Sequence, residues 1–254
     1  MSGLLLPSSD MEAKEKAYLF GLRTGDLNGR RDSRHTIHAR LSTTHPAMAG
    51  LFIESFNVYG RCSMSPDLAY LPGRYCWKLL ARLDERFSFF VEKPVQIPVA
   101  SSSFFPFFAG YSDSEGSWCI YNDKGRAAVA FVIESKDRVV LIQSALELKN
   151  SGFHPLLYRA SRDGQSDSPK VRLEVRRRDE VRTLARILIA LSRHREKIAK
   201  MKLVLETEES SWADIDPKSK AFKQSVAAEV ASFVGAAEIQ YNIRHSRAVA
   251  GVVG

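Results

Sequence analysis

Cysteine is scarce in this chain of 254 residues: Cys62, Cys76 and Cys119 are the only three, and none has a CxxC or Cys/His spacing. This number and spacing indicate neither a disulfide framework nor a zinc site, so we interpret all three as small buried hydrophobes. Long apolar runs are also missing, since no stretch approaches the roughly 18 residues that span a bilayer and residues 3–7 are too short for a signal-peptide core. We therefore expect a cytoplasmic protein with no membrane partner.

Positive charge is what the chain has in excess. Its 44% hydrophobic and 26% charged residues are typical of a soluble globular protein with one or two compact units. The formal net charge of +8 and the isoelectric point near 9.4 indicate a polyanionic partner. The balance is +3 in residues 1–103, +7 in residues 104–205 and −2 in residues 206–254, so the basic surplus lies outside the tail.

A pattern that occurs twice is the most informative feature. Residues 19–26 and 108–115 each contain an apolar run, a glycine and then one acid after a small residue. The acids, Asp26 and Glu115, lie 89 residues apart. This spacing fits two similar half-sized units in one chain rather than a short solenoid repeat. Each unit brings one carboxylate.

The order of predicted elements also recurs. Periodicity and turn residues predict, for the first half, a helix over 13–25, a strand over 35–42, a helix over 46–56, a turn or loop over 66–73, a strand over 75–83 and a short helix over 86–91. They predict, for the second half, a helix through 114, strands over 117–121 and 127–134 around a turn at 122–125, a helix over 137–149, a strand over 171–178 and a helix from 179 to about 191. The tail has a helical period over 222–234.

A connector separates the two halves. Residues 92–103 read EKPVQIPVASSS, with two prolines, three serines and no helical period, which is typical of a stiff linker followed by helix-capping residues. We therefore divide the chain into a first repeat over 1–95, a linker over 96–103, a second repeat over 104–205 and a C-terminal extension over 206–254. The sequence assigns no task to the extension.

The two acids suggest a metal site. Each motif helix carries small residues one turn apart, in the pairs Gly21/Gly25 and Gly110/Ser114. Such helices pack closely, which would bring their ends and the acids that follow together. Two converging carboxylates repel each other unless a divalent cation lies between them, and oxygen donors favour Mg²⁺ or a related ion such as Mn²⁺.

The segments FAGYSDSEG (108–116) and LFGLRTGDL (19–27) resemble the motif of the LAGLIDADG homing endonucleases, in the single-chain form with two motifs and nearest to archaeal intron-encoded members. The segment 19–27 departs from the pattern at Leu27, where glycine is usual. The resemblance covers about residues 13–205. It implies an α+β fold of two pseudo-symmetric αββαββα repeats, whose antiparallel sheets form a DNA-binding saddle and whose motif helices meet at the interface.

The resemblance also implies roles for individual residues. Asp26 and Glu115 would bind divalent metal, with the carbonyls of Gly25 and Ser114 completing the shells. Basic residues near the metals would neutralise charge on the phosphate, and the matching positions are Lys136, Arg82 and Arg178. Strand faces would contact the major groove through Arg34, Thr36, His38, Arg40, Lys78, Arg126, Arg172, Glu174 and Arg176.

These expectations add up to a sequence-specific, metal-dependent double-strand DNA endonuclease, monomeric and encoded by a mobile intron. One alternative is a binding protein on the same fold, either an intron RNA maturase or a DNA-binding regulator without catalysis. Another is a basic α+β interaction protein with fortuitous motifs. The presence of both acids favours the nuclease, because an acid beside DNA phosphates repels them unless a metal is present.

Overall fold

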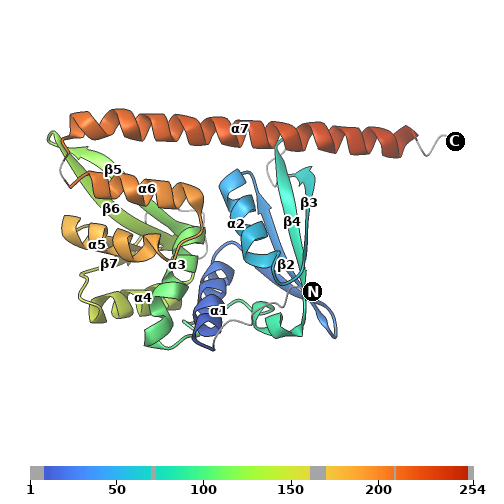
Figure 1. Ribbon diagram of the computed structural model, residues 1–254, viewed down its shortest axis with the longest axis horizontal. Helices are drawn as coiled ribbons and strands as arrows, with labels where there is room; N and C mark the ends of the chain where they lie inside the picture. Colours follow the sequence, from blue (N-terminus) through green and yellow to red (C-terminus); the bar gives the residue numbers. More distant parts are fainter. Residues whose placement is uncertain (1–8, 70–72, 161–169, 209, 251–254) are drawn as a thin grey trace, which may run out of the picture. The chain divides into compact units, whose positions relative to one another are not determined.

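The computed structural model describes residues 9–69, 73–160, 170–208 and 210–250, and Figure 1 labels its helices and strands. The first half contains α1 (Ser9–Thr24), β1 (Asn28–Ser33), β2 (Thr36–Thr43), α2 (Pro46–Phe56), β3 (Arg61–Leu68), β4 (Tyr75–Leu83) and the 3₁₀ helix η1 (Glu85–Phe90). The second half contains η2 (Ser101–Ser103), α3 (Phe104–Glu115), β5 (Gly116–Asp123), β6 (Arg126–Ser135), α4 (Arg138–Asn150), β7 (Leu156–Arg159), β8 (Val171–Val175), α5 (Arg178–Ile189), α6 (Arg195–Glu206) and α7 (Trp212–Ala250).

Two antiparallel sheets of four strands repeat one topology. Their strand orders are β1-β2-β4-β3 and β5-β6-β8-β7, so each sheet places its second and fourth strands at the centre. Each sheet follows a motif helix and is interrupted by one helix after its second strand. The predicted α+β class and the predicted repeat of element order are therefore confirmed.

The chain forms two compact units that do not follow the sequence repeats. Unit 1 consists of residues 1–26, 93–193 and 197–219, and unit 2 of residues 27–92, 194–196 and 220–254. Helix α1 thus groups with α3 in unit 1, whereas the β1–β4 sheet that follows α1 in sequence belongs to unit 2. The repeat boundaries given above stay a prediction about the sequence.

Unit 2 is built on one apolar face of the β1–β4 sheet. Ile37, Ala39 and Leu41 alternate along β2 and are buried, which confirms the period-2 pattern predicted there. Helix α2 lies against this face and buries Phe52 and Phe56 (Figure 1). The opposite face of the sheet is left to polar side chains.

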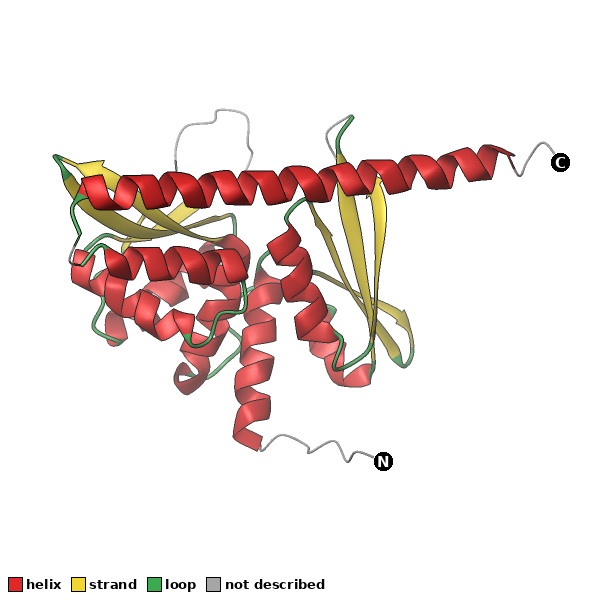
Figure 2. Cartoon of the chain, turned by 45° about the horizontal axis from the view of Figure 1, so that its top comes forward, coloured by secondary structure: helices red, strands yellow, loops and turns green. Residues whose placement is uncertain are grey.

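Helix α7 also contributes to unit 2. The indole nitrogen of Trp77 on β4 donates a hydrogen bond to the Phe233 carbonyl at 2.8 Å, and the two rings lie 5.6 Å apart. The ring of Tyr75 likewise lies 5.4 Å from that of Tyr241. Figure 2 shows α7 as one continuous helix, much longer than the segment 222–234 predicted from its period.

Unit 1 buries its motif helix almost completely. Phe104, Phe107, Phe108 and Tyr111 of α3 are all fully buried, and Phe108 packs edge-on against Phe131 of β6. Few residues of α3 are left to face solvent, so its first turns are apolar on every side, and Ser112 and Asp113 of its last turn are buried polar residues.

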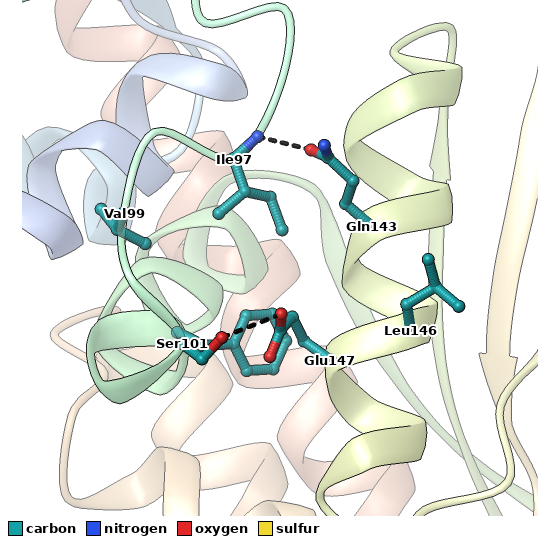
Figure 3. A pocket seen from close by; sticks show the side chains of 7 residues that line it. Ile97, Val99, Ser101, Gln143, Leu146 and Glu147 are labelled. Atoms are coloured by element: carbon teal, nitrogen blue, oxygen red, sulfur yellow. Dashed lines mark hydrogen bonds between the residues drawn. The ribbon is translucent and has the colours of Figure 1, made fainter.

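The linker is held against α4 of the same unit. Figure 3 shows the backbone N–H of Ile97 donating to the side-chain oxygen of Gln143 at 2.7 Å. The Ser101 hydroxyl donates to the Glu147 carboxylate at 3.1 Å in the same view. These residues line a small open hollow between the linker and α4.

Several expected element boundaries were wrong. Pro66 to Leu68, expected in a loop, continue β3, because an edge strand tolerates a proline that donates no ladder hydrogen bond; residues 70–72 of that expected loop lie outside the described residues. Strand β8 ends at Val175, so the residues through 178 leave the sheet. Among the described residues, no helix combines the length and apolarity needed to cross a membrane.

Candidate metal centre and nucleic-acid interface

Helices α1 and α3 pack side by side in unit 1 at unusually short range (Figure 1). A Cβ atom built at Gly21 would lie 2.0 Å from the carbonyl oxygen of Phe107, and one at Gly110 would lie 2.0 Å from that of Tyr18. Both contacts are with backbone, which cannot move aside as a flexible side chain does. Only glycine permits this approach at either position.

The close packing continues to the ends of the two helices. A Cβ atom at Gly25 would lie 2.2 Å from the Cβ of Ser114 and 3.3 Å from the Cγ of Glu115. The Ser114 hydroxyl donates a hydrogen bond to the Leu22 carbonyl at 3.4 Å. The ends of the two motif helices, which Asp26 and Glu115 mark, are therefore neighbours in the folded chain.

The carboxylates of Asp26 and Glu115 influence each other. The side chain of Asp26 reaches solvent and that of Glu115 is half-buried. Partial burial among protein atoms raises the pKa of both groups, and the charge of Asp26 raises the pKa of Glu115 further. We call Asp26 and Glu115 the acid pair. An uncompensated pair of this kind is stabilised by a bound cation.

The acid pair supplies only part of the coordination shell of a hard divalent ion. Within the described residues, no three or more His, Cys, Asp or Glu side chains gather closely enough to hold a metal ion by themselves. The two carboxylates provide oxygen donors of the type that Mg²⁺ prefers, whereas the predicted donor carbonyl of Ser114 accepts a hydrogen bond from the Lys197 ammonium at 3.1 Å. Mg²⁺ keeps several waters or substrate oxygens when protein supplies one or two carboxylates, so the site is compatible with such an ion.

Two lysines beside the acid pair were missed from the sequence. Lys93 and Lys197 both lower the pKa of Asp26 and of Glu115 through their positive charge. Lys93 also forms a salt bridge of 2.8 Å with Asp137. Lys93 lies between η1 and the linker, and Lys197 lies on α6, so neither belongs to a motif. Only the need of paired acids for compensating charge indicated residues of this kind.

The predicted basic residues near the metals have different surroundings. Lys136 is exposed in the turn between β6 and α4, directly before Asp137, whose charge raises the pKa of Glu115. Arg178 donates a hydrogen bond to the backbone carbonyl of Ala127. Arg82 is exposed on β4 of unit 2. Their catalytic roles stay predictions.

The β1–β4 sheet carries a row of basic residues across all four strands. In register, Arg30 on β1 faces His38 on β2, His38 faces Arg82 on β4, and Arg82 faces Arg61 on β3. Directly paired residues of antiparallel strands share one face of the sheet, and here it is the face opposite the α2 side. We call these four residues the basic row.

The basic row contains two residues that the sequence did not single out. Arg30 and Arg61 lie on strands with little alternation, and only the register places them beside His38 and Arg82. His38 is 6% exposed, with Nε2 3.6 Å from the Asp32 carboxylate. Of the other residues predicted to contact DNA here, Arg40 and Lys78 are exposed on the sheet and Thr36 is half-buried, whereas Arg34 is exposed in the turn between β1 and β2 and not on a strand face. Lys78 is paired with Asp67.

The predicted DNA contacts of the β5–β8 sheet form an ion-pair network instead. Glu174 is 3% exposed and pairs with Arg176 at 2.7 Å and with Arg172 at 3.5 Å. Tyr158 donates its hydroxyl to the same carboxylate, and Arg172 also reaches Glu134 at 3.1 Å. Arg176 lowers the pKa of Glu174, so this carboxylate stays charged despite its burial. Arg126 is exposed at the start of β6.

Comparison with known proteins gives low-identity structural matches. No protein-family model and no curated protein matches the chain. The homing endonuclease I-DmoI, solved in complex with DNA and Ca, is 16% identical with a TM-score of 0.49, covering 75% of this chain and 97% of that one. I-WcaI, a homing endonuclease bound to its DNA recognition sequence, is 12% identical with a TM-score of 0.48, covering 80% and 95%.

A third solved structure is the LAGLIDADG homing endonuclease I-GzeII in complex with a DNA target. It is 8% identical with a TM-score of 0.46, and the match covers 85% of this chain and 96% of that one.

Proposed function

We propose that this protein is a sequence-specific, metal-dependent endonuclease that cuts both strands of DNA at a long, partly asymmetric site. The observation that carries the proposal is the acid pair at the ends of two helices packed at backbone contact distance. Folding brings these carboxylates together against their mutual repulsion. Natural proteins accept such a cost mainly where function requires it.

Asp26 and Glu115 would hold the divalent ion, with the carbonyls of Gly25 and Ser114 as further donors. Mg²⁺ or Mn²⁺, when bound, supplies Lewis-acid stabilisation of the negative charge on a phosphodiester undergoing hydrolysis. Lys93 and Lys197 place positive charge beside the carboxylates and so favour their ionised, metal-binding form. Lys136, Arg82 and Arg178 are the further candidates for neutralising the phosphate.

DNA binding would fall to the open faces of the two sheets. The basic row and its exposed neighbours on β1–β4 suit phosphate contacts and guanine recognition, since arginine donates two parallel hydrogen bonds to either. A four-stranded antiparallel sheet offers ribbons that fit the major groove. The surplus of +8 charges supports a polyanionic substrate.

We further propose a single-chain, monomeric enzyme of the archaeal intron-encoded type. Support comes from the two motifs in one chain and from the repeated element order α-β-β-α-β-β, which together supply both carboxylates without a second copy. The repeats would extend over 1–95 and 104–205, with a linker over 96–103.

Cleavage of a randomised duplex library tests the proposed function. The purified full chain is incubated with the library in Mg²⁺ or in EDTA, and the cut ends are sequenced. We expect a long, partly asymmetric consensus that is cut only with Mg²⁺. Retention of specific DNA or intron RNA without any cutting would contradict the nuclease and favour the regulator or the maturase.

A further inference from the structure

Lys197 makes an unusual set of contacts at the end of the second motif helix. Its ammonium group donates hydrogen bonds to the carbonyl oxygens of Ser112 and Asp113, both at 2.6 Å, and of Ser114 at 3.1 Å. All three donors of the ammonium are thereby directed at the last turn of α3. The lysine itself comes from α6, far outside both motifs.

The position of Lys197 is electrostatically favourable for two separate reasons. The C-terminal carbonyls of a helix carry partial negative charge, which a cation stabilises. The same ammonium lies near enough to the acid pair to stabilise the ionised form of both carboxylates.

We propose that Lys197 is the resident counter-cation of the acid pair, anchored on the α3 carbonyls, and that it sets how tightly the pair binds a divalent ion. This inference rests on the proposed function, since it assumes that the acid pair is the metal site. Lys197 is a positioning residue in this account. It keeps the two carboxylates together before the ion arrives and opposes the ion's charge afterwards.

The account makes a counter-intuitive prediction. A variant that removes the charge of Lys197 leaves Lys93 alone to compensate the acid pair, so the pair attracts a divalent ion more strongly. The expected gain is about threefold to tenfold in Ca²⁺ affinity, as for the loss of one partly screened neighbouring charge. A lysine that served only as a helix cap would, when replaced, leave the affinity unchanged or weaken it by loosening Glu115.

Lys197→Gln is the informative variant, because glutamine keeps a donor for the α3 carbonyls but has no charge. Lys202→Gln is the matched control, since Lys202 is exposed on the same helix and the change removes the same charge. Lys197→Arg retains the charge and should behave like the native protein. Calorimetric titration with Ca²⁺ gives the affinity of each full-length protein, and thermal melting with and without Ca²⁺ gives the stabilisation by the ion.

Tighter Ca²⁺ binding and a larger Ca²⁺-induced rise in melting temperature for Lys197→Gln alone would support the proposal. Unchanged or weaker binding, or equal effects in Lys202→Gln, would overturn it. A Lys197→Gln protein that fails to fold even in Ca²⁺ would also overturn it, because the lysine would then be a structural cap. If the native protein itself binds no divalent ion, the proposed function fails, and that result is distinct from a failure of the lysine.

Discussion

The two sheets have the same topology but opposite electrostatic characters. On the β1–β4 sheet, Arg30, Arg61 and Arg82 of the basic row form no ion pair with any acid among the described residues. On the β5–β8 sheet, Arg172 and Arg176 are both paired with the buried Glu174. The same topology therefore carries three arginines without ion pairs in one unit and an ion-pair network around Glu174 in the other.

The acid pair sharpens this difference. Both motif carboxylates belong to unit 1, together with Lys93 and Lys197, whereas the basic row belongs to unit 2. Under the proposed function, we expect a division of labour, in which unit 1 carries the chemistry and unit 2 carries most of the sequence-independent attraction for a polyanion. Substitutions in the two units should then change different measured quantities.

The largest effect is expected at the acid pair. Asp26→Asn or Glu115→Gln removes a metal ligand while keeping the shape of the side chain, so double-strand cleavage should fall by at least about 10³-fold. Binding to the same DNA should stay within about twofold, because the basic row is intact. Cleavage and gel-shift assays on the selected consensus measure the two quantities separately. Normal cutting by either variant would refute the assignment of these acids.

The next effect concerns stability. Gly110→Ala places a Cβ atom against the Tyr18 carbonyl, so α1 and α3 must separate at a cost of about 3 kcal/mol. Gly50→Ala in α2 of unit 2 is the matched control, since its Cβ would meet nothing within 4 Å and alanine favours the helix by about 1 kcal/mol. Denaturant unfolding measures both. Equal stability of the two variants would show that the motif helices do not need their close approach.

Loss of the basic row should weaken binding in a salt-dependent way. Replacing Arg30, Arg61 and Arg82 together by alanine should lower the slope of log affinity against log salt by about 0.9 for each phosphate contact that is lost. The double replacement of Arg172 and Arg176 should change the slope less, because Glu174 already neutralises them. Titrations of labelled duplex at several salt concentrations measure the slope for each variant. A larger change of slope from the replacement of Arg172 and Arg176 than from the replacement of the three basic-row arginines would contradict the prediction.

The smallest expected effect is a gain in affinity for duplex DNA. Glu174→Gln keeps a hydrogen-bond partner for Tyr158 but releases Arg172 and Arg176 from their carboxylate. Affinity for non-specific duplex should then rise by a few-fold, with a steeper salt dependence. Glu134→Gln is the control, since Glu134 is exposed and pairs only with Arg172 in that network. Equal changes in DNA affinity for both variants would show that Glu174 does not hold the two arginines back from DNA.

Most of this architecture can be predicted from the sequence, because local residue patterns determine most of the helices and strands. Alternating apolar residues identified β2 and β8, and glycines one turn apart identified the close-packed helices. Strands β1 and β3 escaped because NGRRDS and RCSMSPDL show little alternation at a sheet edge. Local patterns also give no cross-strand register, which is why Arg30 and Arg61 were missed.

Charged partners that lie far apart in the sequence are the second feature that local patterns do not predict. The acid pair could be predicted, since the two motifs repeat, but Lys197 lies 82 residues beyond Glu115 and shares no motif with it. Glu174 looked like a side chain available to DNA, because a strand pattern does not show that two arginines and a tyrosine enclose it. Charge compensation is a property of the folded chain.

Direct titration of the protein with Mn²⁺ tests the central claim, that Asp26 and Glu115 together form a divalent-ion site. Calorimetry on the native chain, Asp26→Asn and Glu115→Gln compares their affinities without any DNA cleavage. We predict that the native protein binds Mn²⁺ and that each variant loses at least about tenfold in affinity, since each removes one of two carboxylate ligands. Equal Mn²⁺ affinity in all three proteins would contradict the account.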